Sequence, residues 1–186
     1  MVPPGGIHPV ISDRVANHIS LKIDVTPTLE HFVNCLRSHG RGDLDWQFMS
    51  EESPRLILKA AHEAVGPLTI YDDTFELTLE FGRCYHCHFD GSESELPPNA
   101  TEQDHLDAAA ALAAEYVARI LDLRIGVAVH YQGDHCTGAS LIDLDDAGMT
   151  ASKFAASASG FVGGKVRSER FLWTGPIPDP GILDGE

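Results

Sequence analysis

Soft and imidazole side chains gather in one short segment, residues 84–90, which reads Cys-Tyr-His-Cys-His-Phe-Asp. Residues two apart on a β-strand share a face, so His86 and His88 would present their rings on the same side. Imidazole and thiolate groups are ligands that Zn²⁺ prefers, and catalytic zinc sites combine three protein ligands with an open position for water. The segment could therefore supply two of the three ligands that such a site needs.

The third ligand would come from another part of the chain. His130 is the first candidate because it lies on the polar side of a second predicted strand, and Cys84 or His135 could replace it. A zinc-bound water held there would attack an ester, an amide or a phosphate, with Glu80 or Asp90 as the base. These residues define a zinc-dependent hydrolase hypothesis.

Other interpretations of the same segment compete with this one. Cys84-x-x-Cys87 could be half of a zinc knuckle, which needs a turn over these four residues, and His135 or Cys136 would complete it. The alternation of side chains through Phe89 favours an extended strand instead. Because the two-histidine pattern lacks a fixed third ligand, we expect no catalytic residue and no cofactor, with zinc only under the hydrolase alternative.

The charge of the chain limits its partners. Its 186 residues include 13 Lys and Arg against 28 Asp and Glu, which gives a net charge of −15. Each phosphate contact in nucleic-acid binding needs a basic side chain, and anionic membranes attract the same groups. We therefore expect neither nucleic acid nor membrane as a partner.

The N-terminal segment and the cysteines suggest a compartment. Residues 1–6 lack the basic and apolar regions of a signal peptide, and four cysteines are too few for a disulfide scaffold. We expect a cytoplasmic protein with reduced thiols.

Four helices are predicted from capping signals and apolar periodicity. Thr26-Pro27 starts a helix over residues 27–39, and Ser53-Pro54 repeats the same signature and predicts a helix over about 54–65. A long apolar stripe predicts a third helix over about 101–121, and an Ala-rich run predicts a short fourth helix ending near Ser159.

Strands are predicted where the spacing of apolar residues changes from the helical period of 3.6 residues to the strand period of two residues. Phe75, Leu77, Leu79 and Phe81 alternate with polar residues, which predicts a hairpin with residues 68–72 and a strand that can continue to Phe89. Further strands are expected over 123–131, 139–144 and 165–173, with a turn over 132–138 and weak strand character at 7–10 and 20–25. Residues 40–52 are expected to form a loop held to the core by its large apolar side chains.

This order of elements predicts the α+β class. The fold would be a mainly antiparallel sheet with helices packed on one face and N-terminal helices added. Residues 1–173 would form a single domain, and residues 174–186 an irregular or disordered tail. A homo-oligomer that pairs exposed sheet edges is compatible with the sequence.

Part of the chain resembles a group of known proteins. His86-x-His88-Phe89-Asp90 ends a strand and is followed by an acidic loop, a helix, and the strand 123–129 with a Gly-containing hairpin. Over residues 68–145 this order is similar to small uncharacterised bacterial α+β proteins, some of immunity-protein type encoded beside secreted toxins. The resemblance transfers no catalytic residue, and it implies a neutralising protein in the bacterial cytosol.

The charge and the resemblance together favour an acidic interaction protein that neutralises a basic protein partner. Its binding surface would combine carboxylates such as Asp90 with an aromatic anchor, for which Trp46, Phe48 and Trp173 are the candidates. The zinc-dependent hydrolase is the alternative.

Overall fold

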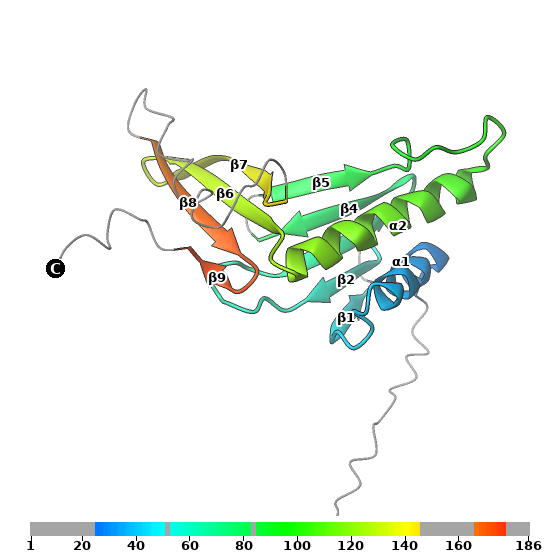
Figure 1. Ribbon diagram of the computed structural model, residues 1–186, viewed down its shortest axis with the longest axis horizontal. Helices are drawn as coiled ribbons and strands as arrows, with labels where there is room; N and C mark the ends of the chain where they lie inside the picture. The colour runs from blue at the N-terminus through cyan, green and yellow to red at the C-terminus, as the bar shows by residue number, and fades with distance from the viewer. Residues whose placement is uncertain (1–24, 51–52, 83–84, 146–165, 178–186) are drawn as a thin grey trace, which may run out of the picture.

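The computed structural model describes residues 25–50, 53–82, 85–145 and 166–177 (Figure 1). The strands predicted at 7–10 and 20–25 and the Ala-rich helix ending near Ser159 lie outside these residues, as does Cys84. The elements are α1 (Pro27–Ser38), β1 (Trp46–Met49), β2 (Arg55–Leu58), β3 (Leu68–Asp73), β4 (Glu76–Phe81), β5 (Tyr85–Phe89), α2 (Glu102–Leu121), β6 (Ile125–Gln132), β7 (His135–Asp143), β8 (Val166–Leu172) and β9 (Gly175–Pro176).

The first sheet has five antiparallel strands in the order β1-β2-β3-β4-β5, so each strand pairs with its neighbour in sequence. The two helices pack against one another, and α2 lies along β4 (Figure 1). The inner side chains of the sheet alternate with polar ones on the outer face, as the period of two requires. Helices on one side of an antiparallel sheet confirm the predicted α+β class.

The second sheet has four antiparallel strands in the order β7-β6-β8-β9. The fold therefore contains two sheets where the sequence predicted one. Apolar side chains of β6 and β8 join the same core as the helices and the first sheet, among them Ile125, Val127 and Phe171.

Both helices begin where the sequence predicted. The Thr26 hydroxyl accepts a hydrogen bond from the Leu29 amide at 3.3 Å, and proline follows it at the first helical position. Thr101 and Asp104 form a capping box at the start of α2.

The helix predicted over residues 54–65 is wrong, and so is the loop predicted over 40–52. Residues 55–58 form β2 and residues 46–49 form β1. Leu56 and Leu58 are both buried while Arg55 and Ile57 point to the other face, which is the period of a strand. A proline after serine precedes a strand as readily as a helix, and the Pro54 carbonyl accepts a hydrogen bond from the Asp72 amide beside the sheet.

Two turns also differ from the prediction. The strand through Phe81 does not run on to Phe89, because β5 returns antiparallel to β4. The turn between β6 and β7 consists of two residues, Gly133 and Asp134, where a longer one was predicted. β9 pairs with β8 inside the segment predicted as a tail.

Among the described residues, no helix is long and apolar enough to cross a bilayer.

Candidate binding surface

Phe75 is exposed at the tip of the hairpin that joins β3 to β4. Asp73 pairs with Glu76, so Thr74 and Phe75 form the two-residue turn. The Phe75 side chain is 71% exposed and is the one large apolar side chain so placed among the described residues. The sequence prediction that Phe75 continues the inward-facing row of Leu77 is therefore wrong.

The hairpin tip lies at one end of the molecule together with the loop after β5 and the start of α2. Leu77 pairs with Phe89, which places the tip beside the end of β5. The loop leaves β5 there and leads into α2 (Figure 1). A Cβ atom at Gly91 would lie 2.3 Å from the His105 carbonyl oxygen, so the loop backbone touches the first turns of the helix.

Carboxylates crowd these three segments. Residues 72–118 contain eleven Asp and Glu but only one Arg and no Lys. We call the following exposed or half-buried set the acidic end: Asp73, Glu76, Asp90, Glu93, Glu95, Glu102 and Asp104.

No lysine or arginine among the described residues forms an ion pair with a member of the acidic end. Hydrogen bonds from Ser92 lower the pKa of Asp90, and those from Thr101 lower the pKa of Asp104. The positive end of the α2 dipole further favours charge on Asp104. The lowered pKa values keep Asp90 and Asp104 ionised at neutral pH, where they contribute to a negative field at this end of the molecule.

Three of the described arginines pair with carboxylates near the C-terminal end of α2. Arg41 pairs with Asp122, and Arg119 pairs with Asp143. Arg124 pairs with Asp145 at 2.6 Å. Among the described residues, carboxylates at this end of α2 therefore have arginine partners, whereas those of the acidic end have no lysine or arginine partner.

The outer face of the first sheet continues from the hairpin as a connected polar surface. The Thr78 hydroxyl donates to Asp73 at 2.8 Å and contacts His88 Nδ1 at 3.1 Å, and the same His88 nitrogen lies 2.8 Å from Glu76. These contacts fix the carboxylates of Asp73 and Glu76 beside the tip.

Farther from the hairpin tip, side-chain contacts also connect polar residues on the same face of the sheet. Tyr71 donates to Glu80 at 2.9 Å, and the Arg55 guanidinium stacks 5.7 Å from the centre of the Tyr71 ring. Asp72 points inward instead, where Thr26 donates to it and burial raises its pKa.

The aromatic anchors expected from the sequence contribute to packing. Trp46 is half-buried against Phe32, with ring centres 5.7 Å apart in an edge-on arrangement. Phe48 is half-buried beside the same core, and Trp173 is only 9% exposed. Asp90, the expected carboxylate, is exposed within the acidic end.

The structure brings two of the candidate zinc ligands together. His86 and His88 lie on the outer face of β5, with ring centres 5.3 Å apart, and residues 85–89 are extended as predicted. His130 lies in the second sheet, where its ring nitrogens contact two serine hydroxyls. His135 is exposed at the start of β7. In the parts of the chain that the structure describes, no three His, Cys, Asp or Glu side chains are placed to hold a metal ion.

Cys87 lies on the opposite side of β5 from the histidines and faces α2. Burial raises its pKa to about 11, and burial also raises the pKa of Tyr116 on the helix. A thiol with a raised pKa is a poor nucleophile, because the thiolate is the reactive form. This environment suits packing better than thiol chemistry.

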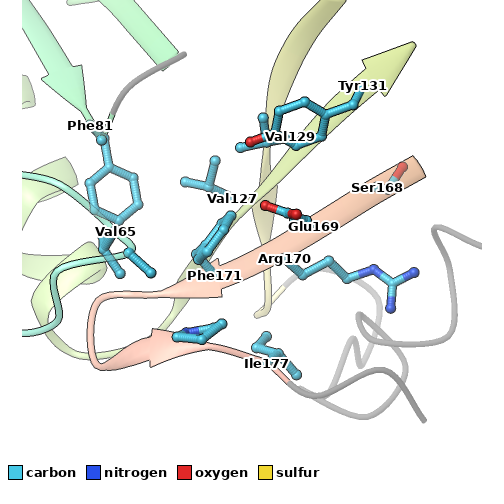
Figure 2. A pocket seen from close by; sticks show the side chains of 13 residues that line it. Val65, Phe81, Val127, Val129, Tyr131, Ser168, Glu169, Arg170, Phe171 and Ile177 are labelled. Atoms are coloured by element: carbon cyan, nitrogen blue, oxygen red, sulfur yellow. The ribbon is translucent and has the colours of Figure 1, made fainter. Parts of the chain in front are cut away.

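A cleft of about 600 Å³ opens between the two sheets (Figure 2). Its walls are mainly apolar, with Val65 and Phe81 facing Val127 and Phe171 (Figure 2). Ser168 and Arg170 of β8 also border it, and Figure 2 shows the Arg170 side chain leaving the strand away from Phe171.

Comparison of the chain with protein-family models, with curated proteins and with solved structures finds no match.

Proposed function

We propose that this chain is an acidic interaction protein that binds and neutralises a basic protein partner in the cytoplasm, and that the acidic end is its binding surface. The observation that carries the proposal is the exposed Phe75 ring among carboxylates that form no ion pair with a lysine or arginine of the described residues. Like charges held together without compensation repel one another, so this arrangement costs stability unless a cationic surface covers it.

The two features of the surface have separate roles in recognition. Uncompensated carboxylates attract a cationic partner over about a Debye length and raise the association rate. An exposed aromatic side chain supplies apolar area that becomes buried on contact, which is typical of the residues that dominate binding energy. A basic protein with an apolar pocket among its Lys and Arg side chains fits both.

The proposal is tested with two variants that each remove three negative charges, one at the acidic end and the other elsewhere on the surface. The variant Glu93→Gln/Glu95→Gln/Glu102→Gln removes three exposed charges from the acidic end. The control Glu30→Gln/Glu63→Gln/Asp134→Asn removes three exposed charges elsewhere, so both variants have the same net charge. Each is titrated with a short lysine-rich peptide that contains one aromatic residue, at low ionic strength, by calorimetry.

We expect the acidic-end variant to bind the peptide about tenfold or more weakly than the parent protein. The control should change the affinity by about twofold or less, because its charges are scattered. Equal losses in the two variants would show that total charge, and not this surface, governs binding.

A further inference from the structure

The outer face of the second sheet carries a cluster of polar side chains that the proposed function does not use. His130 pairs with Ser168 across the strands, and Ala128 lies between Ser140 on one side and Arg170 on the other. Residues two apart on β6 and on β8 share a face, so these side chains surround the small Ala128 methyl group.

His130 is held between two hydroxyl groups. Its Nδ1 lies 2.8 Å from Ser168 Oγ and its Nε2 lies 3.3 Å from Ser140 Oγ. A neutral imidazole donates at one nitrogen and accepts at the other, so one serine keeps its hydroxyl hydrogen available for another acceptor. The ring therefore holds the two hydroxyl oxygens in fixed positions beside it.

Arg170 is the unusual member of the cluster. Its side chain is 9% exposed, and its buried Nε has no hydrogen-bond partner. Among the described residues no carboxylate forms an ion pair with it, although the chain has 28 acidic residues against 13 basic ones. Glu169, its neighbour in sequence, belongs to the other face of β8.

A buried guanidinium without a counter-charge is unfavourable, because its lost hydration is not replaced. Its planar fork of N–H groups matches the two oxygens of a carboxylate or a phosphate. Ser140 is exposed and His130 half-buried, so the cluster is open to solvent on the Ser140 side.

We propose that Arg170, His130, Ser168 and Ser140 form a binding site for the carboxylate or phosphate group of a small molecule. The guanidinium supplies the charge and two hydrogen bonds, and the serine hydroxyl whose hydrogen His130 leaves available supplies a further donor. This site lies in the other sheet from the acidic end, so neither proposal depends on the other.

The test is thermal unfolding of the full chain at constant ionic strength, with chloride replaced by inorganic phosphate in one arm and by acetate in the other. The variant Arg170→Met removes the guanidinium and keeps the apolar stem. The control Arg37→Met removes an exposed arginine that donates to Asn34 on its own helix. Each salt also stabilises folded proteins in general, because it is excluded from their surface. This effect is equal in the three proteins, so a difference between their melting-temperature shifts measures binding at the site.

We expect phosphate, acetate or both to raise the melting temperature of the parent protein and of the Arg37→Met control, and to lose that effect in Arg170→Met. A rise in melting temperature with phosphate alone would identify the bound group as a phosphate. A rise with both anions would show that the site accepts a carboxylate as well. Without either anion, Arg170→Met should melt higher than the parent, because an uncompensated buried charge is gone. Identical responses of parent and Arg170→Met in both arms would overturn the proposal.

A second measurement keeps the proposal testable if Arg170→Met does not fold. The His130 ring resonances of the parent protein are followed by NMR during the same two titrations. They should shift with saturation in the arm that stabilises the protein, and Ser140→Ala should weaken the apparent affinity between about twofold and tenfold. Ring resonances that do not move in either titration would contradict the site.

Discussion

Substitution of Phe75 should affect peptide binding without a large effect on the stability of the fold. The Phe75→Ala variant should change the free energy of unfolding by about 0.5 kcal/mol or less, since the ring is mostly in water. The Leu77→Ala variant, at a buried position of the adjoining strand β4, should cost about 2–5 kcal/mol. Urea unfolding measures both values.

The same Phe75→Ala variant should weaken binding of the lysine-rich aromatic peptide by about tenfold, because truncating a central aromatic contact costs more than about 1 kcal/mol. Unchanged peptide affinity together with unchanged stability would mean that the ring has no role at the surface.

The face on which a side chain lies could be predicted from the sequence inside a strand, where the two-residue alternation is regular. It could not be predicted at a turn, where the alternation ends. The histidines of β5 share a face as predicted, because the strand is extended through both. Phe75 fits the same period but falls in a two-residue turn, and its position depends on where the hairpin reverses. The packing of Trp46 against Phe32 joins two segments whose contact no local pattern could reveal.

At the scale of the elements, the close contact between Gly91 and α2 holds the acidic loop in place. Gly91 and Gly133 both have positive φ angles, 75° and 64°, so alanine at either position carries a backbone cost of about 1–2 kcal/mol. A Cβ atom at Gly133 would meet no atom within 4 Å, whereas one at Gly91 would clash with the His105 carbonyl.

Gly91→Ala should therefore destabilise the protein by about 1–3 kcal/mol more than Gly133→Ala, as measured by urea unfolding. It should also weaken peptide binding, because the carboxylates of the loop are displaced. Equal stability of the two variants would show that the loop yields without cost and is not fixed by this contact.

The ion pairs near the C-terminal end of α2 predict how stability depends on pH. The hydrogen bond from Arg119 lowers the pKa of Asp143, and the one from Arg124 lowers the pKa of Asp145. A carboxyl group whose pKa is lower in the folded state stabilises the protein above its unfolded pKa, near 3.8 for Asp, and loses that contribution as pH falls further.

Asp143→Asn should lower the free energy of unfolding at pH 7 by roughly 0.5 kcal/mol, the size expected of a partly exposed pair. It should also reduce the loss of stability between about pH 4 and pH 2. Asp134→Asn, at an exposed turn, is the control and should leave the profile unchanged. A steeper acid loss in Asp143→Asn than in the parent would be inconsistent with this role of the pair.

The elements themselves were predictable to different degrees. α1 and α2 have both a capping residue and an apolar stripe, and these two signals agree. The segment from Ser53 has the capping signal but forms β2, because pairing with β3 buries Leu56 and Leu58 together. Strand pairing joins segments that the local sequence does not identify. The stability that it contributes could therefore not be compared with the helix propensity of residues 54–65.

At the scale of the whole molecule, α2 separates two electrostatic environments. Its N-terminal end lies among carboxylates that have no lysine or arginine partner in the described part of the chain, and its C-terminal end adjoins the ion pairs that Arg119 and Arg124 form with Asp143 and Asp145. The excess of negative charge was evident from composition alone. Its concentration at one end was not, because it depends on the register of β4 with β5 and on the approach of the loop to the helix.

The location of the binding surface is tested most directly by amide chemical-shift mapping of the parent protein with the lysine-rich aromatic peptide. We predict that the largest shifts fall on residues 73–76, 90–95 and 101–105, and that they diminish together as salt is raised. Shifts centred on the paired carboxylates Asp122, Asp143 and Asp145, or spread evenly over all exposed acidic residues, would contradict the assignment of the acidic end as the binding surface.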